Sequence, residues 1–584
     1  MASTTDVITL ENFASKMPPW APDKTNHLYA LVDMGSNGIR FSISDLSPPS
    51  SRLLKCLYRE RAAISLFDAL NKSSSNGPLV FPPEVIAQVS RTLARFKSIA
   101  DEYGVPMEHI SVFATEAMRK ADNAASMLDA ILTQSGLGVY ILAPEVETLF
   151  GAMGARSSFT HVNGLFLDLG GGSVQITYMN SSIENYELLA AQRGKSLPFG
   201  AAKLIKVLES GEEQVRATAI NDLQAGMQSA FSKLRQEFPT LDDTQRGPKS
   251  DGVDIYLCGG GFRGYGSILM HNDPIQPYPI SAVGAYTVDE ASFKQVRAMY
   301  RFNITYDGKI FGMSKRRRAQ FPAIAAVVEA LIHSVPCIRT ATFCSGGNRE
   351  GALLLKLPYI IRETDPLQLL YQPNSNMTVD ILQSVASTIQ SSLPVEVESS
   401  GVPTIFTSGL GHLFASQIWA HVGEPNDANA ASEIHRAITR DPSAPGFTHL
   451  ARSLLGLTLC HRWGATLGPI DQQLYTNIRR LVNKTNGEAA FWAEYIGVIT
   501  GLLADMCPTV PKTPEKLRRS IRFKSTIVSG KKKPKIELIV SLSSVAMQTL
   551  DPQTIVDTFK SIGKRQDANK GDRKVKVIVQ NIPS

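Results

Sequence analysis

The sequence predicts an α/β protein in which two related lobes precede a mainly helical region. Over about the first 360 of the 584 residues, strand-like runs alternate with helix-like runs, which is the order expected where helices pack on sheets. A unit made of a strand, an Asp-x-Gly turn and a second strand begins near residue 27 and returns near residue 164. An internal repeat of this kind indicates two lobes of similar architecture.

The first repeat unit is expected to form a hairpin. His27–Val32 is an apolar run, Asp33–Gly38 holds the turn, and Ile39–Ile43 alternates apolar with polar residues. A helix is expected from Pro82 to Ala100, because proline favours the first helical turn and apolar residues recur at helical spacing. The next elements expected are a strand, a helix, a strand and a helix, at residues 110–115, 116–133, 139–142 and from 144 onward.

The second repeat unit has the same plan. Leu165–Leu167 is typical of a buried strand, Asp168–Ser173 is a glycine turn, and Val174–Tyr178 alternates apolar with polar residues. Two further glycine clusters, at 258–261 and 345–347, also follow apolar runs. Because ligands of open α/β sheets bind where strand ends and their loops converge, the four loops predict one polar ligand in a crevice between the lobes.

Beyond about residue 360 the pattern changes to long amphipathic helices, for example at 380–392 and 449–463. The last stretch has a β-α-β rhythm, and a basic linker is expected before it, near residues 529–534. We therefore expect an N-terminal tail, a first lobe, a second lobe, a helical C-terminal domain, and a basic linker with a small α/β module, at residues 1–24, 25–148, 149–358, 359–510 and 511–584.

The net charge of +7 is concentrated near the C-terminus. Residues 511–584 hold 17 Lys or Arg against 6 Asp or Glu, which leaves a net charge of −4 for residues 1–510. Nucleic-acid binding is therefore not expected of the chain as a whole. Only the run Lys531–Lys535 would favour it, and a solvated linker is the simpler interpretation of that run.

Neither a membrane span nor a secretory signal is expected. The best candidate for a membrane span, residues 323–332, is too short to cross a bilayer and contains Glu329. The N-terminus lacks the basic start and the apolar stretch of a secretory signal, so we expect a cytoplasmic location. The sequence leaves open whether the chain forms a homodimer.

The glycine turns have the composition of anion-binding sites, because glycine lets the backbone approach an oxyanion and point successive N–H groups at it. The candidate phosphate-binding residues are Gly35, Ser36, Asn37, Gly170, Gly171, Gly172 and Ser173, with Gly260 of the third cluster as a secondary candidate. Asp33 and Asp168 end buried strands, where an unpaired carboxylate is costly. Either a divalent cation bridges both to phosphate oxygens, or each aspartate caps its own turn.

Five motifs then occur in a fixed order. They are Asp33-x-Gly-Ser-Asn, Thr115-Glu-Ala-Met-Arg119, Asp168-x-Gly-Gly-Gly-Ser173, Ser196-Leu-Pro-Phe-Gly200-Ala201 and Gly346-x-x-Arg349-Glu350-Gly351. With these motifs, over residues 28–358, the chain resembles the exopolyphosphatase and guanosine pentaphosphate phosphatase (Ppx/GppA) family. Its length, its C-terminal extension and its modified motifs look most like the fungal retrograde regulation protein 2 branch of that family.

The resemblance implies the duplicated, ribonuclease H-like fold of actin and Hsp70. It also implies Mg²⁺-dependent hydrolysis of a terminal phosphoryl group of polyphosphate or of a phosphorylated nucleotide. Under it, Glu147 is the general base, Arg119 stabilises charge on the transferred phosphoryl group, and Asp33 and Asp168 hold Mg²⁺. Arg349 and Glu350 are secondary candidates, as is Gln175. Without the flanking motifs, Glu147 and Arg119 would be interpreted as ordinary helix-surface residues.

The chain also departs from the family pattern. Val146 and Gln175 both stand where the family has a glutamate, and an amide in place of a carboxylate removes negative charge and a potential metal ligand. Two hypotheses therefore remain. The protein is a hydrolase of phosphoanhydride bonds, or it is a catalytically weak or inactive sensor that binds such a ligand and signals mitochondrial or metabolic state through a protein partner. The basic run Lys315–Arg318 either lines an entrance to the cleft or lies on a solvated helix face.

Overall fold

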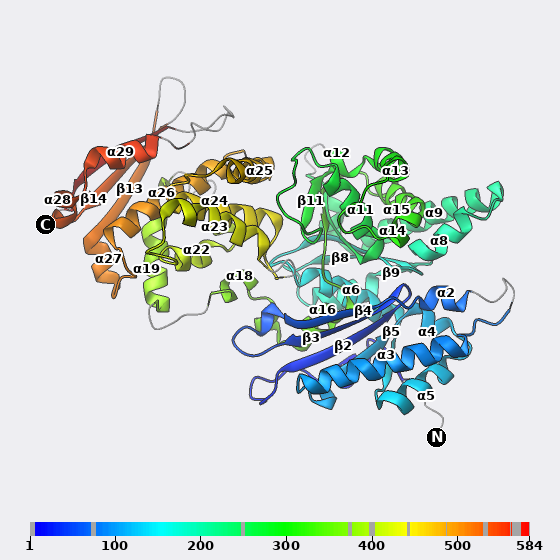
Figure 1. The fold of residues 1–584 in the computed structure, drawn as a ribbon. Helices are drawn as coiled ribbons and strands as arrows, with labels where there is room; N and C mark the ends of the chain where they lie inside the picture. Colours follow the sequence, from blue (N-terminus) through cyan, green and yellow to red (C-terminus); the bar gives the residue numbers. More distant parts are fainter. Residues whose placement is uncertain are drawn as a thin grey trace. The chain divides into compact units, whose positions relative to one another are not determined.

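The chain forms two compact units, which are described separately here (Figure 1). The first unit comprises residues 1–272, 282–366 and 443–445, and the second comprises residues 273–281, 367–442 and 446–584. The computed structural model describes residues 6–71, 77–246, 251–371, 377–395, 403–440, 444–485, 487–529, 535–560, 562 and 574–582. Both repeat units of the sequence lie in the first unit.

The first repeat unit forms a six-stranded sheet of order β1-β6-β5-β2-β3-β4. The expected hairpin is confirmed, since β2 and β3 pair antiparallel with Gly35 opposite Gly38. The neighbours β5 and β6 run parallel to β2, as expected where helices connect the strands. The strands are β1 (Asp6–Ile8), β2 (Leu28–Gly35), β3 (Gly38–Asp45), β4 (Lys55–Ala62), β5 (Ile110–Ala114) and β6 (Val139–Leu142).

The second repeat unit forms a sheet of order β11-β12-β10-β7-β8-β9. Its hairpin pairs β7 with β8, and β10 and β12 follow in parallel beside β7, so five strands repeat the arrangement of the first sheet. This duplication confirms the expected actin-like α/β fold. The strands are β7 (Asn163–Leu169), β8 (Val174–Asn180), β9 (Lys195–Leu197), β10 (Val253–Cys258), β11 (Tyr286–Asp289) and β12 (Ile338–Phe343).

Helices connect and cover the two sheets of the first unit. They are α1 (Phe13–Lys16), α2 (Leu66–Leu70), α3 (Pro83–Glu102), α4 (Glu116–Lys120), α5 (Ala124–Ser135), α6 (Pro144–Arg156), α7 (Tyr186–Arg193), α8 (Ala201–Leu208), α9 (Glu213–Glu237), α10 (Pro239–Asp243), α11 (Gly259–His271), α12 (Glu290–Phe293), α13 (Val296–Thr305), α14 (Lys315–Ala319), α15 (Phe321–Ser334), α16 (Asn348–Lys356) and α17 (Tyr359–Arg362). Single 3₁₀ turns lie at Ser51–Leu53 and Met107–His109.

Two local expectations are corrected by the structure. Residues 116–133 form two helices instead of one, and the break between them lies at Asn123. The Asn123 side chain accepts a hydrogen bond from the Phe81 N–H and donates one to the Phe81 carbonyl, which fixes it between the helices. Part of the expected tail at 1–24 belongs to the fold. Its strand β1 pairs in parallel with β6, and the Trp20 ring is buried and donates to the Leu46 carbonyl.

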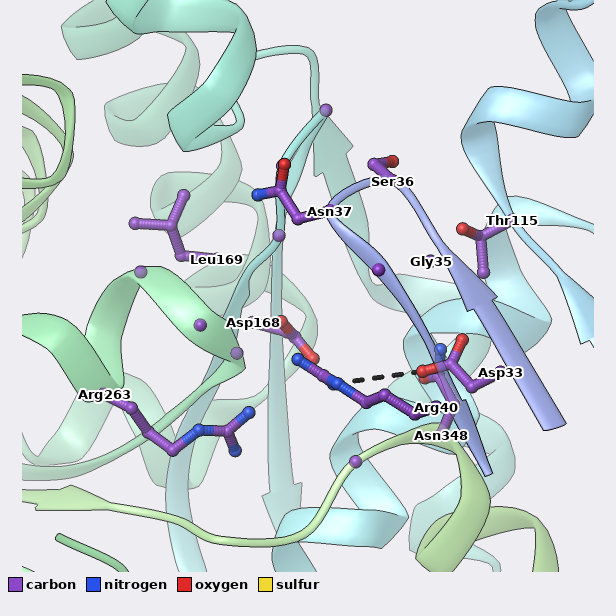
Figure 2. A pocket seen from close by; sticks show the side chains of 18 of the residues that line it. Asp33, Gly35, Ser36, Asn37, Arg40, Thr115, Asp168, Leu169, Arg263 and Asn348 are labelled. Atoms are coloured by element: carbon purple, nitrogen blue, oxygen red, sulfur yellow. Dashed lines mark ion pairs between the residues drawn. The ribbon is translucent and has the colours of Figure 1, made fainter. Parts of the chain in front are cut away.

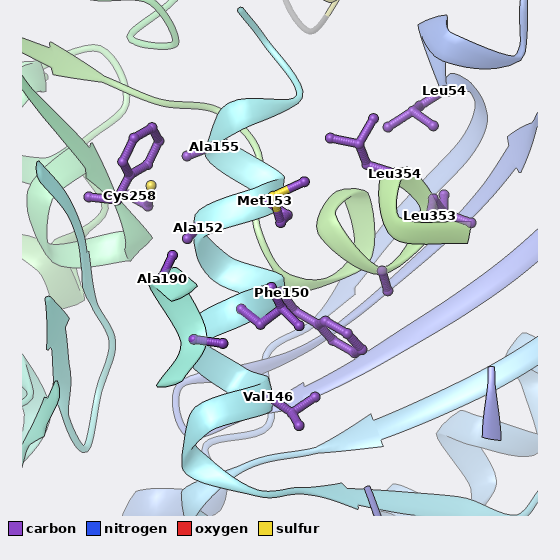
Figure 3. Packing of buried hydrophobic residues seen from close by; sticks show 14 of the residues in the cluster. Leu54, Val146, Phe150, Ala152, Met153, Ala155, Ala190, Cys258, Leu353 and Leu354 are labelled. Atoms are coloured by element: carbon purple, nitrogen blue, oxygen red, sulfur yellow. The ribbon is translucent and has the colours of Figure 1, made fainter. Parts of the chain in front are cut away.

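Helices α6 and α16 pack against each other at the centre of the first unit (Figure 3). Phe150 and Met153 of α6 face Leu353 and Leu354 of α16 in one buried apolar cluster. Glycines let the two backbones touch at this crossing. A Cβ at Gly154 would overlap the backbone of Gly347, and one at Gly346 or Gly351 would overlap the backbone of α6. The chain passes from the first sheet to the second through α6.

The second unit is helical with one small sheet. Its helices are α19 (Val379–Gln390), α21 (Thr404–Thr407), α22 (Gly411–Gln417), α23 (Asn426–Thr439), α24 (His449–Arg462), α25 (Pro469–Thr485), α26 (Ala489–Met506), α27 (Pro514–Ser520), α28 (Ser544–Thr549) and α29 (Pro552–Lys560), and α18 (Pro366–Leu369) precedes them. Of the described helices, α26 is long and apolar enough to cross a membrane, whereas the best candidate expected from the sequence was 323–332. Since 83% of that helix is buried, it is the core helix of this unit.

The expected β-α-β rhythm is present at the end of the chain as β14 (Lys535–Leu542), α29 and β15 (Lys574–Asn581). An additional strand, β13 (Ile521–Val528), pairs antiparallel with β14 and makes a three-stranded sheet. The expected linker near 529–534 therefore joins two paired strands, and residues 530–534 lie outside the described residues.

Candidate phosphate-binding site

A polar cavity of about 340 Å³ lies between the two sheets of the first unit (Figure 2). Both glycine hairpins contribute to its wall, as the sequence predicts, together with the third and fourth glycine clusters. The candidate residues that line it are Asp33, Gly35, Ser36, Asn37, Glu147, Asp168, Gly170, Gly171, Gly172, Ser173, Gln175, Gly260, Arg349 and Glu350. Arg119 does not line it.

The carbonyl groups of the first turn are held by neighbouring elements. The oxygen of Ser36 accepts from the Phe67 N–H at 3.0 Å and from the Ser65 hydroxyl at 3.3 Å. The oxygen of Asn37 accepts from the Arg61 guanidinium at 2.9 Å. These carbonyl oxygens would repel an anion, and each already has a hydrogen-bond donor.

The second turn is held in the same way by the start of α8. The carbonyl oxygens of Gly170, Gly171 and Gly172 accept from the N–H groups of Ala201, Ala202 and Gly200 at 2.9 to 3.1 Å. A Cβ at Gly200 would overlap the backbone of Gly172 and Ser173, so this close approach requires glycine. The motif Ser196–Ala201 thus fixes the shape of the second glycine turn.

Three of the carboxylates that line the cavity, those of Asp33, Glu147 and Asp168, repel one another. Burial raises the pKa of Glu147 to about 7, Arg119 lowers it, and Asp168 and Asp33 raise it further. Burial also raises the pKa of Asp168, with Arg263 and Arg40 acting against this and Asp33 adding to it. Asp33 is 5% exposed, and its Oδ1 atom is buried without a hydrogen-bond partner. This part of the cavity therefore favours binding of a cation.

The structure places Arg119 beside Glu147, outside the set of residues that line the cavity. Its guanidinium donates to Glu147 Oε2 at 2.8 Å and to the Leu142 carbonyl at 2.5 Å. Contact of Arg119 with a phosphoryl group stays a prediction. Arg119 instead orients the carboxylate of Glu147 and favours its ionised form.

Five arginines on the cavity wall were not among the predicted site residues. They are Arg40, Arg61, Arg263, Arg316 and Arg317. Arg40 extends from β3 toward Asp33, with 3.9 Å between its guanidinium and Asp33 Oδ2 (Figure 2), and Arg61 lies opposite Arg40 on β4. Burial lowers the pKa of Arg317 to about 10, and Arg263, Arg40 and Arg61 lower it further. Mutual repulsion of these cations favours binding of a multivalent anion.

The alternatives for the basic run Lys315–Arg318 are now resolved residue by residue. Arg316 and Arg317 line the cavity, Lys315 is exposed, and Arg318 donates to backbone carbonyls of residues 303–308. Arg316 of α14 also reaches the first lobe, where it donates to the Asn37 side chain at 2.7 Å and the Ser65 hydroxyl at 2.8 Å. The run therefore contributes to the cavity wall through two of its four residues.

Gln175 lies at the position in the second hairpin that Arg40 occupies in the first. It pairs with Asp168 across the strands, as Arg40 pairs with Asp33. Its amide donates to the Ser173 hydroxyl at 2.7 Å, which ties the side chain to the glycine turn. The neutral amide thus holds the turn and adds no charge to the cavity.

The residues present fit a magnesium ion. Mg²⁺ is usually held by one or two carboxylates together with substrate phosphates. Asp33 and Asp168 line one cavity, and the buried Oδ1 atom of Asp33 has no hydrogen-bond partner. Among the described residues there is no group of three or more His, Cys, Asp or Glu side chains that would bind a metal without the substrate. The arrangement supports a cation that binds together with phosphate.

Comparison with known proteins agrees with this geometry. Residues 45–360 match the model of the Ppx/GppA phosphatase family, and residues 366–582 match that of the RTG2 C-terminal domain. The chain belongs to the Ppx/GppA phosphatase family. The Ppx/GppA match begins at the last residue of β3 and so does not include the first glycine turn. The match to the RTG2 C-terminal domain covers almost all of the second unit after residue 366.

This Ppx/GppA chain is similar to a retrograde regulation protein and to solved phosphatase structures. Retrograde regulation protein 2 of Saccharomyces cerevisiae is 30% identical over 497 residues, which cover 83% of this chain and 82% of the relative. The predicted similarity to that branch is confirmed. Among solved structures, the Ppx/GppA phosphatase of Aquifex aeolicus is 18% identical and covers 57% of this chain and 99% of its own, with a TM-score of 0.42. An exopolyphosphatase of Cytophaga hutchinsonii is 20% identical and covers 56% and 96%, with a TM-score of 0.41.

Proposed function

We propose that the cavity binds the terminal phosphates of polyphosphate or of a phosphorylated nucleotide and hydrolyses the last phosphoanhydride bond. The observation that carries this proposal is the convergence of two glycine turns, six arginines and the buried carboxylate of Glu147 on one cavity. Glycine turns and guanidinium groups are the standard partners of phosphate oxygens. A carboxylate with a pKa near 7 is suited to general base catalysis at neutral pH.

Each group has a separate task in this proposal. The N–H groups of the turns and the arginines bind and orient the phosphates. Glu147, held by Arg119, orients a water molecule and accepts its proton as the water attacks the terminal phosphorus. Asp33 and Asp168 would hold Mg²⁺, which supplies charge neutralisation at the phosphate oxygens.

The test is phosphate release from inorganic polyphosphate in the presence of Mg²⁺. The change Glu147→Gln removes the base and keeps the size of the side chain, and release should fall by roughly 100-fold or more. Glu145→Gln is the matched control, since Glu145 is an exposed residue on the same helix and does not line the cavity. Equal release by the wild-type protein and the Glu147→Gln variant would refute hydrolysis by this site.

A second candidate is a sensor that binds the same ligand with little or no turnover and signals through a protein partner. Gln175 favours it, because this neutral amide bonded to Ser173 leaves the second lobe with one carboxylate fewer near the proposed cation. The arginine-rich wall would still bind the anion.

The two candidates are distinguished by combining binding with turnover. Calorimetry with inorganic triphosphate should show binding to the wild-type protein and to Glu147→Gln alike if the cavity is a sensor site. Substituting Gly171, whose Cβ position lies against the Asn37 side chain, with Asp should abolish binding by placing a carboxylate among the phosphates. Binding to the wild type that is unchanged in Gly171→Asp would exclude both candidates.

A further inference from the structure

The three-stranded sheet of the second unit has two chemically different faces. Side chains alternate between the faces of a strand, so the register of β13, β14 and β15 assigns each residue to one of them. On the first face, Phe523, Leu538 and Val540 are buried. The opposite face, which we call the open face, carries Arg522, Lys524, Thr526, Val528, Lys535, Glu537, Ile539, Ser541, Lys574, Lys576, Ile578 and Gln580.

The first face is covered by helices of the same unit. Ser525 donates its hydroxyl to the Ser392 carbonyl at 2.8 Å, and that carbonyl also accepts from Tyr495 of α26 at 2.7 Å. Phe559 of α29 is buried with its ring centre 5.9 Å from that of Tyr495. This face therefore belongs to the core of the second unit, where α29 packs against β15 and α26.

The open face is basic and accessible. Its five cationic residues, Arg522, Lys524, Lys535, Lys574 and Lys576, are all exposed. Glu537 is the one acidic residue among the described residues of this face, and it pairs with Lys576 at 2.7 Å. Four cations thus remain without an acidic side chain on the face. Between them lie Ile539 and Ile578, which pair across β14 and β15 and are only partly buried.

We propose that the open face is a docking surface for an acidic segment of a protein partner. Charge complementarity selects the partner, because several cations gathered on one face favour carboxylates. The two isoleucines at its centre suit one or two apolar side chains of the partner, since protein interfaces have an apolar centre within a polar rim.

The same face is a poor match for single-stranded nucleic acid. Proteins that bind such strands on a sheet stack the bases on aromatic side chains. None of the described residues of the open face is aromatic. Ile539 and Ile578 at the centre of the face have no aromatic ring on which a base could stack. A protein segment is therefore favoured over RNA by the side chains present.

The experiment uses the full chain and a short fluorescent peptide in which glutamates flank leucines, read by fluorescence anisotropy. The paired change Arg522→Glu and Lys524→Glu should weaken peptide binding by roughly tenfold or more, and added salt should weaken the wild-type complex. A peptide with glutamine in place of glutamate should bind poorly. The matched control is Arg297→Glu with Arg301→Glu, an equal charge change at exposed residues of α13 in the first unit.

The binding results distinguish an acidic protein segment from RNA and from a lipid surface. Binding of the acidic peptide that is lost in the paired variant and kept in the control supports the proposal. Equal binding by the paired variant overturns it, and so does tighter, face-dependent binding of single-stranded RNA or of phosphatidylserine vesicles. If the reversed charges reduce the thermal stability of the chain, Arg522→Gln with Lys524→Gln removes the charge without reversing it and should weaken binding in the same direction. Triphosphate binding in the cavity is independent of this surface and should not change.

Discussion

The two glycine hairpins of the first unit share one plan and differ in charge. Each places an aspartate at the end of its first strand and a second polar residue seven positions later, directly across the hairpin. That second residue is Arg40 in the first hairpin and Gln175 in the second. The turns are equally long, and the Gly170 N–H donates to the Ser173 carbonyl where Gly35 pairs with Gly38. The two hairpins thus keep one backbone plan, while Arg40 gives the first a positive charge that Gln175 does not give the second.

The largest expected effect concerns how the second turn is held. In Gly200→Ala, the added methyl group overlaps the backbone of Gly172 and Ser173, so we expect the free energy of unfolding to fall by about 3 kcal/mol. Thermal denaturation measures it. Gly170→Ala is the control, because a Cβ at Gly170 lies 3.5 Å from the nearest atom, the Ser173 carbonyl oxygen. Similar stability losses in both variants would contradict a special role for Gly200.

The next largest effect is expected when a carboxylate replaces the Gln175 amide of the second hairpin. In Gln175→Glu, an additional carboxylate stands opposite Asp168 on the second hairpin, and Mg²⁺ binding in the presence of triphosphate should tighten by roughly 30-fold, or about 2 kcal/mol. Calorimetry of Mg²⁺ binding measures this without reference to turnover. Gln88→Glu on α3 adds the same charge outside the cavity and serves as the control. Unchanged Mg²⁺ affinity in Gln175→Glu would show that the second hairpin does not contact the cation.

A third change makes the first hairpin resemble the second. Arg40→Gln removes a guanidinium from the cavity, so triphosphate binding should weaken about tenfold. Arg91→Gln, an exposed residue of α3, is the control for the loss of one positive charge. Binding that is equally strong in both variants would mean that the cationic wall does not recognise phosphate.

The smallest expected effect is a shift of pH dependence. If Glu147 must be ionised, phosphate release rises with pH through about 7. Arg119 favours the ionised form, so Arg119→Gln should raise the pKa of Glu147 and move the midpoint upward by about one pH unit. A pH profile of release measures the shift. A midpoint that stays in place, or moves to lower pH, would contradict the role assigned to Arg119.

Sequence reasoning found the acidic and glycine-rich residues of this site, with Arg349 and the run Lys315–Arg318 among the basic ones, and missed Arg40, Arg61 and Arg263. Asp33, Asp168 and the turns stand in a local pattern of strand, aspartate and glycine that is visible without a structure. Arg61 reaches the cavity only because β4 pairs with β3, and Arg263 only because α11 starts at the third glycine cluster. Arg40 had a detectable signal, since it repeats the spacing of Gln175 from its aspartate. Contacts that arise from pairing between distant elements leave no such signal.

The fold was predictable to the same degree. The internal repeat predicted two sheets of similar strand order, because a duplicated pattern of strands and turns forms the same arrangement twice. The break between α4 and α5 was not predictable, since it depends on the contact of Asn123 with Phe81, 42 residues away. Likewise, β1 has only three residues and becomes a strand through pairing with β6.

The main chains of α6 and α16 are in direct contact where the two helices cross. Where main chains touch directly, no side-chain layer is available to yield when one of them is displaced. Glu147 stands on one of these helices, and Arg349 and Glu350 stand on the other. A single methyl group added at Gly154 or Gly351 would therefore force α6 and α16 apart and shift Glu147, which lies about two helical turns from Gly154, relative to Arg349 and Glu350. The change would impair the chemistry of the cavity without altering a side chain that lines it.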